Sequence, residues 1–315
     1  KEMSYFMSLN PLSLFRAMPG SIAQGMIWGV MALGVYITFR LLDFADLTVD
    51  GSIATGAAVS VMLIRAGVSP IATLPIAFLA GALAGMVTGL LNTALGIPGI
   101  LASILTQISL YSINLNIMGK ANQPVSVDNY PLVVSLRYVT DGSVSRLLFF
   151  LGMIVFLLAL IAVMYWYFGT EQGHAIRATG CNSNMARAQG INTNFIKVLA
   201  LMISNGLVGL CGALYGQFQG ASDVNMGRGA IVIGLAAVII GEVLFGKFAS
   251  KRKLAFAFTL ASVILGAVIY YMVYQFVLWL KMPSDMKLFS AIVVAIFLAI
   301  PYLKEKRTLR KGASK

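Results

Sequence analysis

The sequence predicts an all-α polytopic membrane protein with about 8 to 10 transmembrane helices. Hydrophobic residues make up 59% of the 315 residues and charged residues only 11%, whereas about a quarter of the residues in soluble domains are charged. Several apolar runs reach the roughly 20 residues that a helix needs to cross the ~30 Å hydrocarbon core of a bilayer. Because these runs use up most of the chain, no stretch of about 100 residues is left for a soluble catalytic domain.

The first half of the chain predicts five spans separated by connectors of different character. An acidic connector at 43–51 separates the first two spans, and prolines open the third. A Gly-Ile-Pro-Gly turn precedes the fourth span, and the long polar segment 119–144 precedes the fifth. The expected spans are 21–42, a second ending near 64, 70–95, 100–118 and 147–168.

The polar segment 170–197, called the polar island below, interrupts this apolar pattern. It reads TEQGHAIRATGCNSNMARAQGINTNFIK and holds His174, the only histidine of the chain, together with three cations and a helix-compatible core at 182–189. A segment this polar between two spans must lie in water or contact another protein. We interpret it as a contact with another protein.

Four more spans and a basic tail follow the polar island. The expected spans are 198–218, 230–245, 254–280 and 288–303, and the tail is 304–315. If the polar island is cytoplasmic, this count places the tail and the basic loop 247–253 on the same side, as the positive-inside rule requires. The 119–144 segment and the N-terminus then lie outside. Residues 1–20 are expected to form a surface segment ahead of a membrane domain that covers 21–303.

The composition and the missing motifs exclude several classes of protein. The net charge of +12 comes from cations in short loops beside apolar runs, so it indicates membrane orientation and no nucleic-acid partner. Residues 241–247 have the GxxxxGK spacing of a phosphate-binding loop, but Phe248 replaces the Ser or Thr that would contact Mg²⁺. Cys181 lies in the polar island and Cys211 in an apolar run, so we expect no disulfide. Because HExxH, GxSxG and paired intramembrane aspartates are also missing, we expect no enzyme, no metal and no cofactor.

Polar side chains recur at helical spacing along the fourth span, at Ser103, Gln107, Tyr111 and Asn114. Neutral polar groups inside a membrane cost free energy unless they hydrogen-bond to a neighbouring helix or face water. Two interpretations therefore stay open: hydrogen bonds between helices, and the lining of a path for a polar solute. Glu242, near the end of the seventh span, is interpreted first as a structural ion pair with Lys247 or the cations after it.

Glycine spacing carries two further predictions. Glycines spaced by three or four residues in the third and sixth spans, such as Gly81, Gly85 and Gly89, predict closely packed helices. In addition, segments 46–59 and 223–238 each contain an acid, two glycines five residues apart and then small apolar residues. This pattern is a faint internal repeat of the kind found in transporters.

Two patterns within the polar island carry a family resemblance. They are Gly173-x-x-Ile176-Arg177-Ala178-x-Gly180 and Ala186-Arg187-x-x-Gly190-Ile191-Asn192. Together with the flanking segments 46–59 and 205–220, they resemble the cytoplasmic loop of bacterial ABC-importer permeases, in the group that includes the branched-chain amino acid, ribose and nucleoside permeases. The resemblance extends over about residues 20–303. The segments LLDFADLTVDGS and IIGEVLFGK are most similar to those of a subgroup linked to aromatic amino acid uptake.

The resemblance implies a fold with a cytoplasmic coupling helix that docks on an ABC ATPase. Carried over by position, the candidate coupling residues are Arg177, Ala178, Gly180, Ala186, Arg187, Gly190 and Ile191. The implied partners are ATPase subunits that bind the ATP, an extracytoplasmic solute-binding protein that contacts the 119–144 segment, and a second copy of this chain.

The chain is thus expected to be a permease subunit in the inner membrane of a bacterium. It would form the path for a small polar solute, with an aromatic amino acid such as tryptophan or tyrosine favoured. The alternatives are a sugar or nucleoside importer of the same family and a stand-alone channel or secondary carrier.

Overall fold

The computed structural model describes residues 11–126, 128–140, 143–249 and 254–279, with three single positions beyond them. The helices and strands are, in chain order, α2 (Pro11–Tyr36), the π-helical turn η1 (Ile37–Leu41), α3 (Val49–Arg65), α4 (Pro70–Thr93), α5 (Gly99–Met118), β1 (Asn122–Pro124), α6 (Leu136–Thr140), α7 (Ser143–Phe168), α8 (Glu171–Cys181), α9 (Ser183–Ala188), α10 (Thr193–Gln219), β2 (Ala221–Asp223), α11 (Ala230–Ala249) and α12 (Ala255–Trp279). The all-α prediction is confirmed.

Within the described residues, six helices are long and apolar enough to cross a membrane. They are α2 with η1, α4, α5, α7, α10 and α12. Of the other two predicted spans in this part of the chain, α3 has 17 residues and the apolar part of α11 is also short. Residues 11–20, expected as a separate surface segment, belong to α2. The predicted span 288–303 and the tail 304–315 lie outside the described residues, except for positions 292, 295 and 299.

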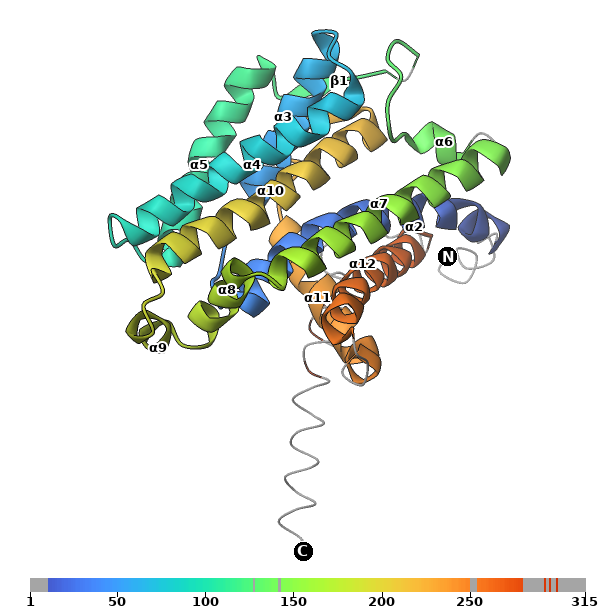
Figure 1. Cartoon of the computed structure of the whole chain (residues 1–315). Coiled ribbons are helices and arrows are strands. Elements are labelled where there is room, and N and C mark those ends of the chain that lie inside the picture. Colours follow the sequence, from blue (N-terminus) through green and yellow to red (C-terminus); the bar gives the residue numbers. More distant parts are fainter. Residues whose placement is uncertain are drawn as a thin grey trace, which may run out of the picture.

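The helix bundle has two distinct ends (Figure 1). One end, called the island end, carries α8 and α9. The opposite end, called the loop end, carries α6 and the two short strands, where Asn122 in β1 pairs with Asp223 in β2 in an antiparallel ladder. The helix α2 and its continuation η1 run between the two ends, since Gly20 near the start of α2 faces Leu136 of α6 and η1 contacts α8.

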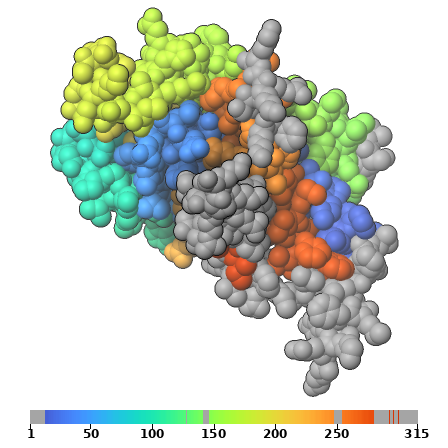
Figure 2. Space-filling view, turned by 90° about the horizontal axis from the view of Figure 1, so that it is seen from below, coloured from blue at the N-terminus to red at the C-terminus, as the bar shows by residue number. Residues whose placement is uncertain are grey.

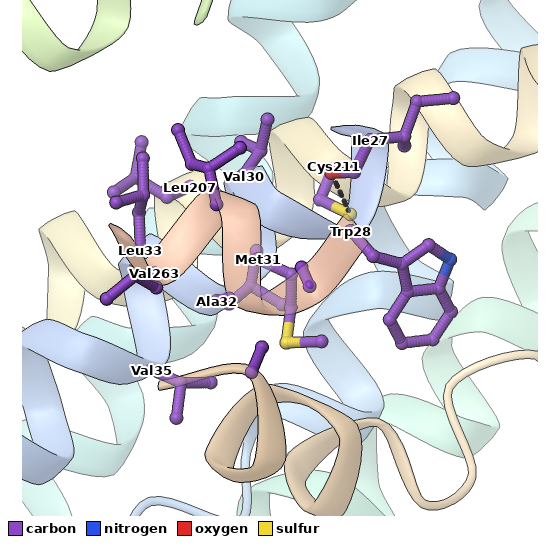
Figure 3. Close-up of a cluster of buried hydrophobic side chains, with 14 of the residues drawn as sticks. Ile27, Trp28, Val30, Met31, Ala32, Leu33, Val35, Leu207, Cys211 and Val263 are labelled. Atoms are coloured by element: carbon purple, nitrogen blue, oxygen red, sulfur yellow. Dashed lines mark hydrogen bonds between the residues drawn. The ribbon is translucent and has the colours of Figure 1, made fainter. Parts of the chain in front are cut away.

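Helix α10 lies at the centre of the bundle, in contact with α2, α3 and α4. The side chains between α2 and α10 form a largely apolar core, in which Ile27 and Met31 are completely buried (Figure 3). The Cys211 thiol of α10 donates to the carbonyl oxygen of Ile27 at 3.3 Å, and Val263 of α12 joins the same cluster. No disulfide forms, because Cys181 and Cys211 are both free.

The predicted close packing of glycine-bearing helices is confirmed at the contact of α10 with α4 and α3. A Cβ atom added to Gly85 of α4 would lie 2.2 Å from the carbonyl oxygen of Leu201 in α10. One added to Gly212 of α10 would lie 2.0 Å from the carbonyl oxygen of Ile53 in α3. These backbones therefore touch directly, which gains dispersion contacts that larger residues would prevent.

We expect the Gly85→Ala variant to destabilise the protein by about 1–3 kcal/mol, because the new methyl group forces α4 away from α10. The matched control is Gly152→Ala in α7, where an added Cβ meets nothing within 4 Å. That change should be neutral or stabilise by up to about 1 kcal/mol, because alanine is the better helix former. Thermal unfolding of the detergent-solubilised protein measures both effects. Equal melting temperatures for the two variants would contradict the close-packing interpretation.

Candidate coupling surface and translocation path

Three side chains cap the N-termini of the three consecutive helices that begin in the polar island. Thr170, Asn182 and Asn192 are the N-cap residues of α8, α9 and α10, and the side-chain oxygen of each accepts a hydrogen bond from a backbone N–H two or three residues further on. Such caps satisfy N–H groups that have no partner within the helix. The polar residues of the island therefore divide it into two short helices ahead of α10.

Helix α8 is wedged against the ends of neighbouring helices, in contact with α7, α10 and η1. Its Ile176 side chain is completely buried. A Cβ added to Gly180 would lie 1.9 Å from the carbonyl oxygen of Leu41, and one added to Gly173 would lie 2.4 Å from the Cα atom of Phe168. Because α8 touches these backbones directly, it cannot move without displacing η1 and the end of α7.

Arg177 faces the bundle. The central carbon of its guanidinium lies 4.1 Å from the ring centroid of Phe256 in α12 and 5.7 Å from that of Phe168 in α7. A cation over an aromatic face is attracted by about 0.5–2 kcal/mol, more when it is desolvated. The arginine therefore attaches α8 to two long helices, a role that the sequence pattern did not indicate.

Helix α9 projects from the island end. Ala186 is 4% exposed and anchors the helix, whereas Met185 is 64% exposed. Arg187 is exposed and donates to the hydroxyl of Thr193 at 3.1 Å. Gly190 has a φ of +86°, which ends the helix. Figure 2 shows the yellow segment at one edge of the molecule.

Two other predicted coupling residues, Ala178 and Ile191, lie in different environments. The side chain of Ala178 is exposed on α8. The backbone N–H of Ile191 donates to the carbonyl oxygen of Ala186 at 3.1 Å, and its side chain packs on the main hydrophobic core. The predicted coupling residues thus include an inward pair on α8, Arg177 and Gly180, and exposed residues on both short helices, namely Ala178 on α8 and Arg187 on α9.

The four polar residues predicted in the fourth span do not share one environment in α5. Ser103 is completely buried and donates to the carbonyl oxygen of Ile100 in its own helix at 2.9 Å, so the structure separates it from the others. Gln107 is half-buried, Tyr111 is 43% exposed and Asn114 is completely buried. These three residues line one pocket of about 290 Å³ between α3, α5 and the segment that follows β2.

Asp50 and Arg228 also line this pocket, and the sequence analysis did not select either as a site residue. Asp50 belongs to the first copy of the faint internal repeat and Arg228 to the second, so the fold brings the two copies together. The carboxylate of Asp50 accepts hydrogen bonds from the backbone N–H groups of Gly229 and Ile231, each at 2.9 Å. Asp50 therefore fixes the start of α11 against the first turn of α3.

A buried polar network lies beside the pocket at the start of α3. Asp46, which is 2% exposed, accepts from the side-chain amide of Asn205 at 2.6 Å and from the backbone N–H of Thr48 at 2.9 Å. Ser52 of α3 donates to the other side of the Asn205 amide at 2.7 Å. The connector after η1 is thereby held to α10.

Glu242 forms an ion pair, as the sequence analysis favoured, but with a different residue. Its carboxylate accepts from the Nε of Arg40 in η1 at 3.0 Å. The side chain of Lys247 and the cations at 251–253 lie outside the described residues. The partner was not recognised because it is 202 residues away in the chain. This pair is partly exposed to solvent, so its net stabilisation is small.

The comparisons with known proteins agree with this architecture. The family described as the permease component of branched-chain amino acid transport systems matches residues 18–301. A tyrosine transport system permease protein of Clostridioides difficile is 40% identical over 279 residues, which cover 88% of this chain and 89% of that protein. No solved structure matches.

Two more distant relatives are named for other transport systems. An inner membrane ABC transporter permease protein of Escherichia coli is 27% identical over 218 residues, covering 69% of this chain and 64% of that protein. An autoinducer 2 import system permease protein of Yersinia pseudotuberculosis is 28% identical over 259 residues, covering 81% of this chain and 68% of that protein. With a family match across nearly the whole bundle, the chain belongs to the permease components of branched-chain amino acid transport systems, multi-pass proteins of the bacterial inner membrane.

Proposed function

We propose that this chain forms the translocation path of an ATP-driven importer for an amino acid, with tyrosine or a similar aromatic amino acid favoured. The observation that carries the proposal is the pair of short helices at the island end: α9 offers an exposed docking surface, and α8 connects that surface to η1, α7 and α12. The name of the Clostridioides difficile relative supports the choice of solute. A sugar-type solute is the second candidate, supported by the autoinducer 2 relative.

The partners follow from this arrangement. An ABC ATPase dimer docks from the cytoplasm on Met185 and Arg187 of α9, and a solute-binding protein delivers the solute at the loop end. ATP is bound by the ATPase alone. The shift of α9 on ATP binding is passed to α8 and then, through Gly180 and Arg177, to the long helices, because a wedged helix moves with its neighbours as a rigid body.

A second copy of the chain covers α5 in this proposal. The outward face of α5 carries Ser109, Tyr111, Ser112 and Asn116, all exposed in the single chain. Polar side chains facing lipid cost free energy, whereas the same side chains facing a water-filled path are solvated. Two copies that face each other through α5 enclose such a path, with Gln107 and Asn114 at its edge.

The proposed docking surface predicts that a variant of α9 loses the ATPase while the permease remains folded. Met185→Asp combined with Arg187→Glu should abolish co-purification of the ATPase, because the variant removes an apolar contact and reverses a charge on the exposed side of α9. The permease itself should remain monodisperse in size-exclusion chromatography. Lys120→Glu, the same charge reversal at the loop end, is the control and should retain the ATPase. Normal co-purification of the α9 variant would refute the docking surface.

The contact of α8 with η1 predicts that a variant of α8 keeps the ATPase but loses solute uptake. Gly180→Ala places a methyl group against the Leu41 carbonyl, so α8 should tilt away from η1 while α9 stays exposed. The complex should keep its ATPase and hydrolyse ATP, but solute uptake into proteoliposomes should fall by about tenfold or more, equivalent to at least ~1.4 kcal/mol of lost coupling. Uptake and hydrolysis measured on the same vesicles test this. Undiminished uptake would show that α8 does not transmit the motion.

The translocation path predicts an effect of Gln107→Leu without loss of assembly. Removal of an amide that hydrogen-bonds a passing solute costs about 1 kcal/mol, so uptake should slow by roughly fivefold. Thr259→Ala in α12 is the matched control, because the Thr259 hydroxyl donates to the carbonyl oxygen of Ala255 in its own helix at 2.9 Å and does not line the pocket. If both variants import at the rate of the unmodified protein, Gln107 serves only structural hydrogen bonding.

A further inference from the structure

We infer that the pocket between α3, α5 and the start of α11 binds the ammonium and carboxylate groups of a zwitterionic amino acid. This inference rests on the proposed function and names the recognition site within the path. The groups that recognise the solute are Asp50, Asn114 and Arg228, and Tyr111 forms an apolar wall beside them.

Asn114 is the strongest indication that the pocket receives a ligand. Its side chain is completely buried, yet neither the amide nitrogen nor the amide oxygen has a hydrogen-bond partner among the described residues. Buried polar groups in native proteins are almost always paired, because an unpaired one loses its hydration without compensation. The residue lines the pocket. A carboxylate would accept from its nitrogen, and an ammonium would donate to its oxygen.

Opposite charges come from the two sides of the pocket. Asp50 enters from α3 and Arg228 from the segment before α11. Each Asp50 oxygen accepts one backbone N–H, from Gly229 or Ile231, and keeps lone-pair capacity for an ammonium group. The guanidinium of Arg228 offers several N–H donors for a carboxylate. A sugar carries neither charge, so this pair of residues favours an amino acid.

The remaining lining residues favour a solute with an apolar or aromatic side chain. Ile108 and Tyr111 lie on the same exposed side of α5 as the pocket and contribute apolar surface to it. The pocket volume of about 290 Å³ is at the lower end of the range for small-molecule sites, which is about 300–1,000 Å³. A single amino acid suits this volume.

The test is protection of a cysteine in the pocket. In the full permease purified with its ATPase, Cys181→Ser removes the exposed native thiol. Ser112→Cys then places a reporter at the pocket, and Asn116→Cys, exposed on α5 outside the pocket lining, serves as the control. The rate of modification by a small methanethiosulfonate is measured with and without L-tyrosine, and in parallel with a mixture of the twenty amino acids.

We expect the amino acid to slow modification at 112 and not at 116. Tyramine and 3-(4-hydroxyphenyl)propanoate each lack one of the two charged groups, so half-protection should require about tenfold higher concentrations. Arg228→Gln and Asp50→Asn should each raise the concentration of L-tyrosine for half-protection by about tenfold. Lys120→Gln, which removes a cation outside the pocket, should leave it unchanged. Asp50→Asn keeps one oxygen acceptor for the α11 backbone, and size-exclusion chromatography confirms that each complex is intact.

The outcomes separate this inference from the proposed function. Equal protection by tyramine, or unchanged protection in both charge variants, overturns the zwitterion site. An absence of protection at 112 in a complex that imports amino acids also overturns it and leaves the proposed function standing. If the complex with its binding protein imports no amino acid when supplied with ATP, the proposed function fails and this inference fails with it.

Discussion

The direct contact between the backbones of α10, α3 and α4 is the constraint on which the rest of the structure depends. It requires glycine at several positions, because a Cβ added to Gly56 would lie 1.9 Å from the carbonyl oxygen of Gly209. The close approach brings Asn205 of α10 within hydrogen-bond distance of Asp46 and Ser52. The connector after η1 is fixed by these bonds, and α3 can therefore begin inside the bundle with Asp50 at its first turn.

The same constraint shapes the two regions proposed to be functional. Because α3 begins inside the bundle, Asp50 reaches the start of α11 and leaves a pocket against α5 that is lined by polar and charged groups. At the island end, glycines again permit backbone contact, here between α8 and the ends of η1 and α7. A motion imposed on the exposed α9 is thereby connected to the long helices, several of which pack on α10 in turn.

Much of the fold could be predicted from the sequence. The expected fourth and fifth spans, 100–118 and 147–168, differ from α5 and α7 by only a few residues at their starts. Apolar runs of this length have one stable structure in a bilayer, because every backbone hydrogen bond must be made within the segment. The helical core expected at 182–189 corresponds to α9, since Asn182 caps it through its own side chain.

The sequence by itself thus determined the six long apolar helices of the described residues, the polar island and the family, because these depend on local composition and spacing. Only the tertiary structure decided which way each side chain points. Arg177 turns inward to Phe256 because the positions of Gly173 and Gly180 fix the rotation of α8 against Phe168 and Leu41. Glu242 pairs with Arg40, and Asp50 lines one pocket together with Arg228. The two residues of each pair are far apart in the chain. Such contacts depend on how the helices pack, which no local pattern specifies.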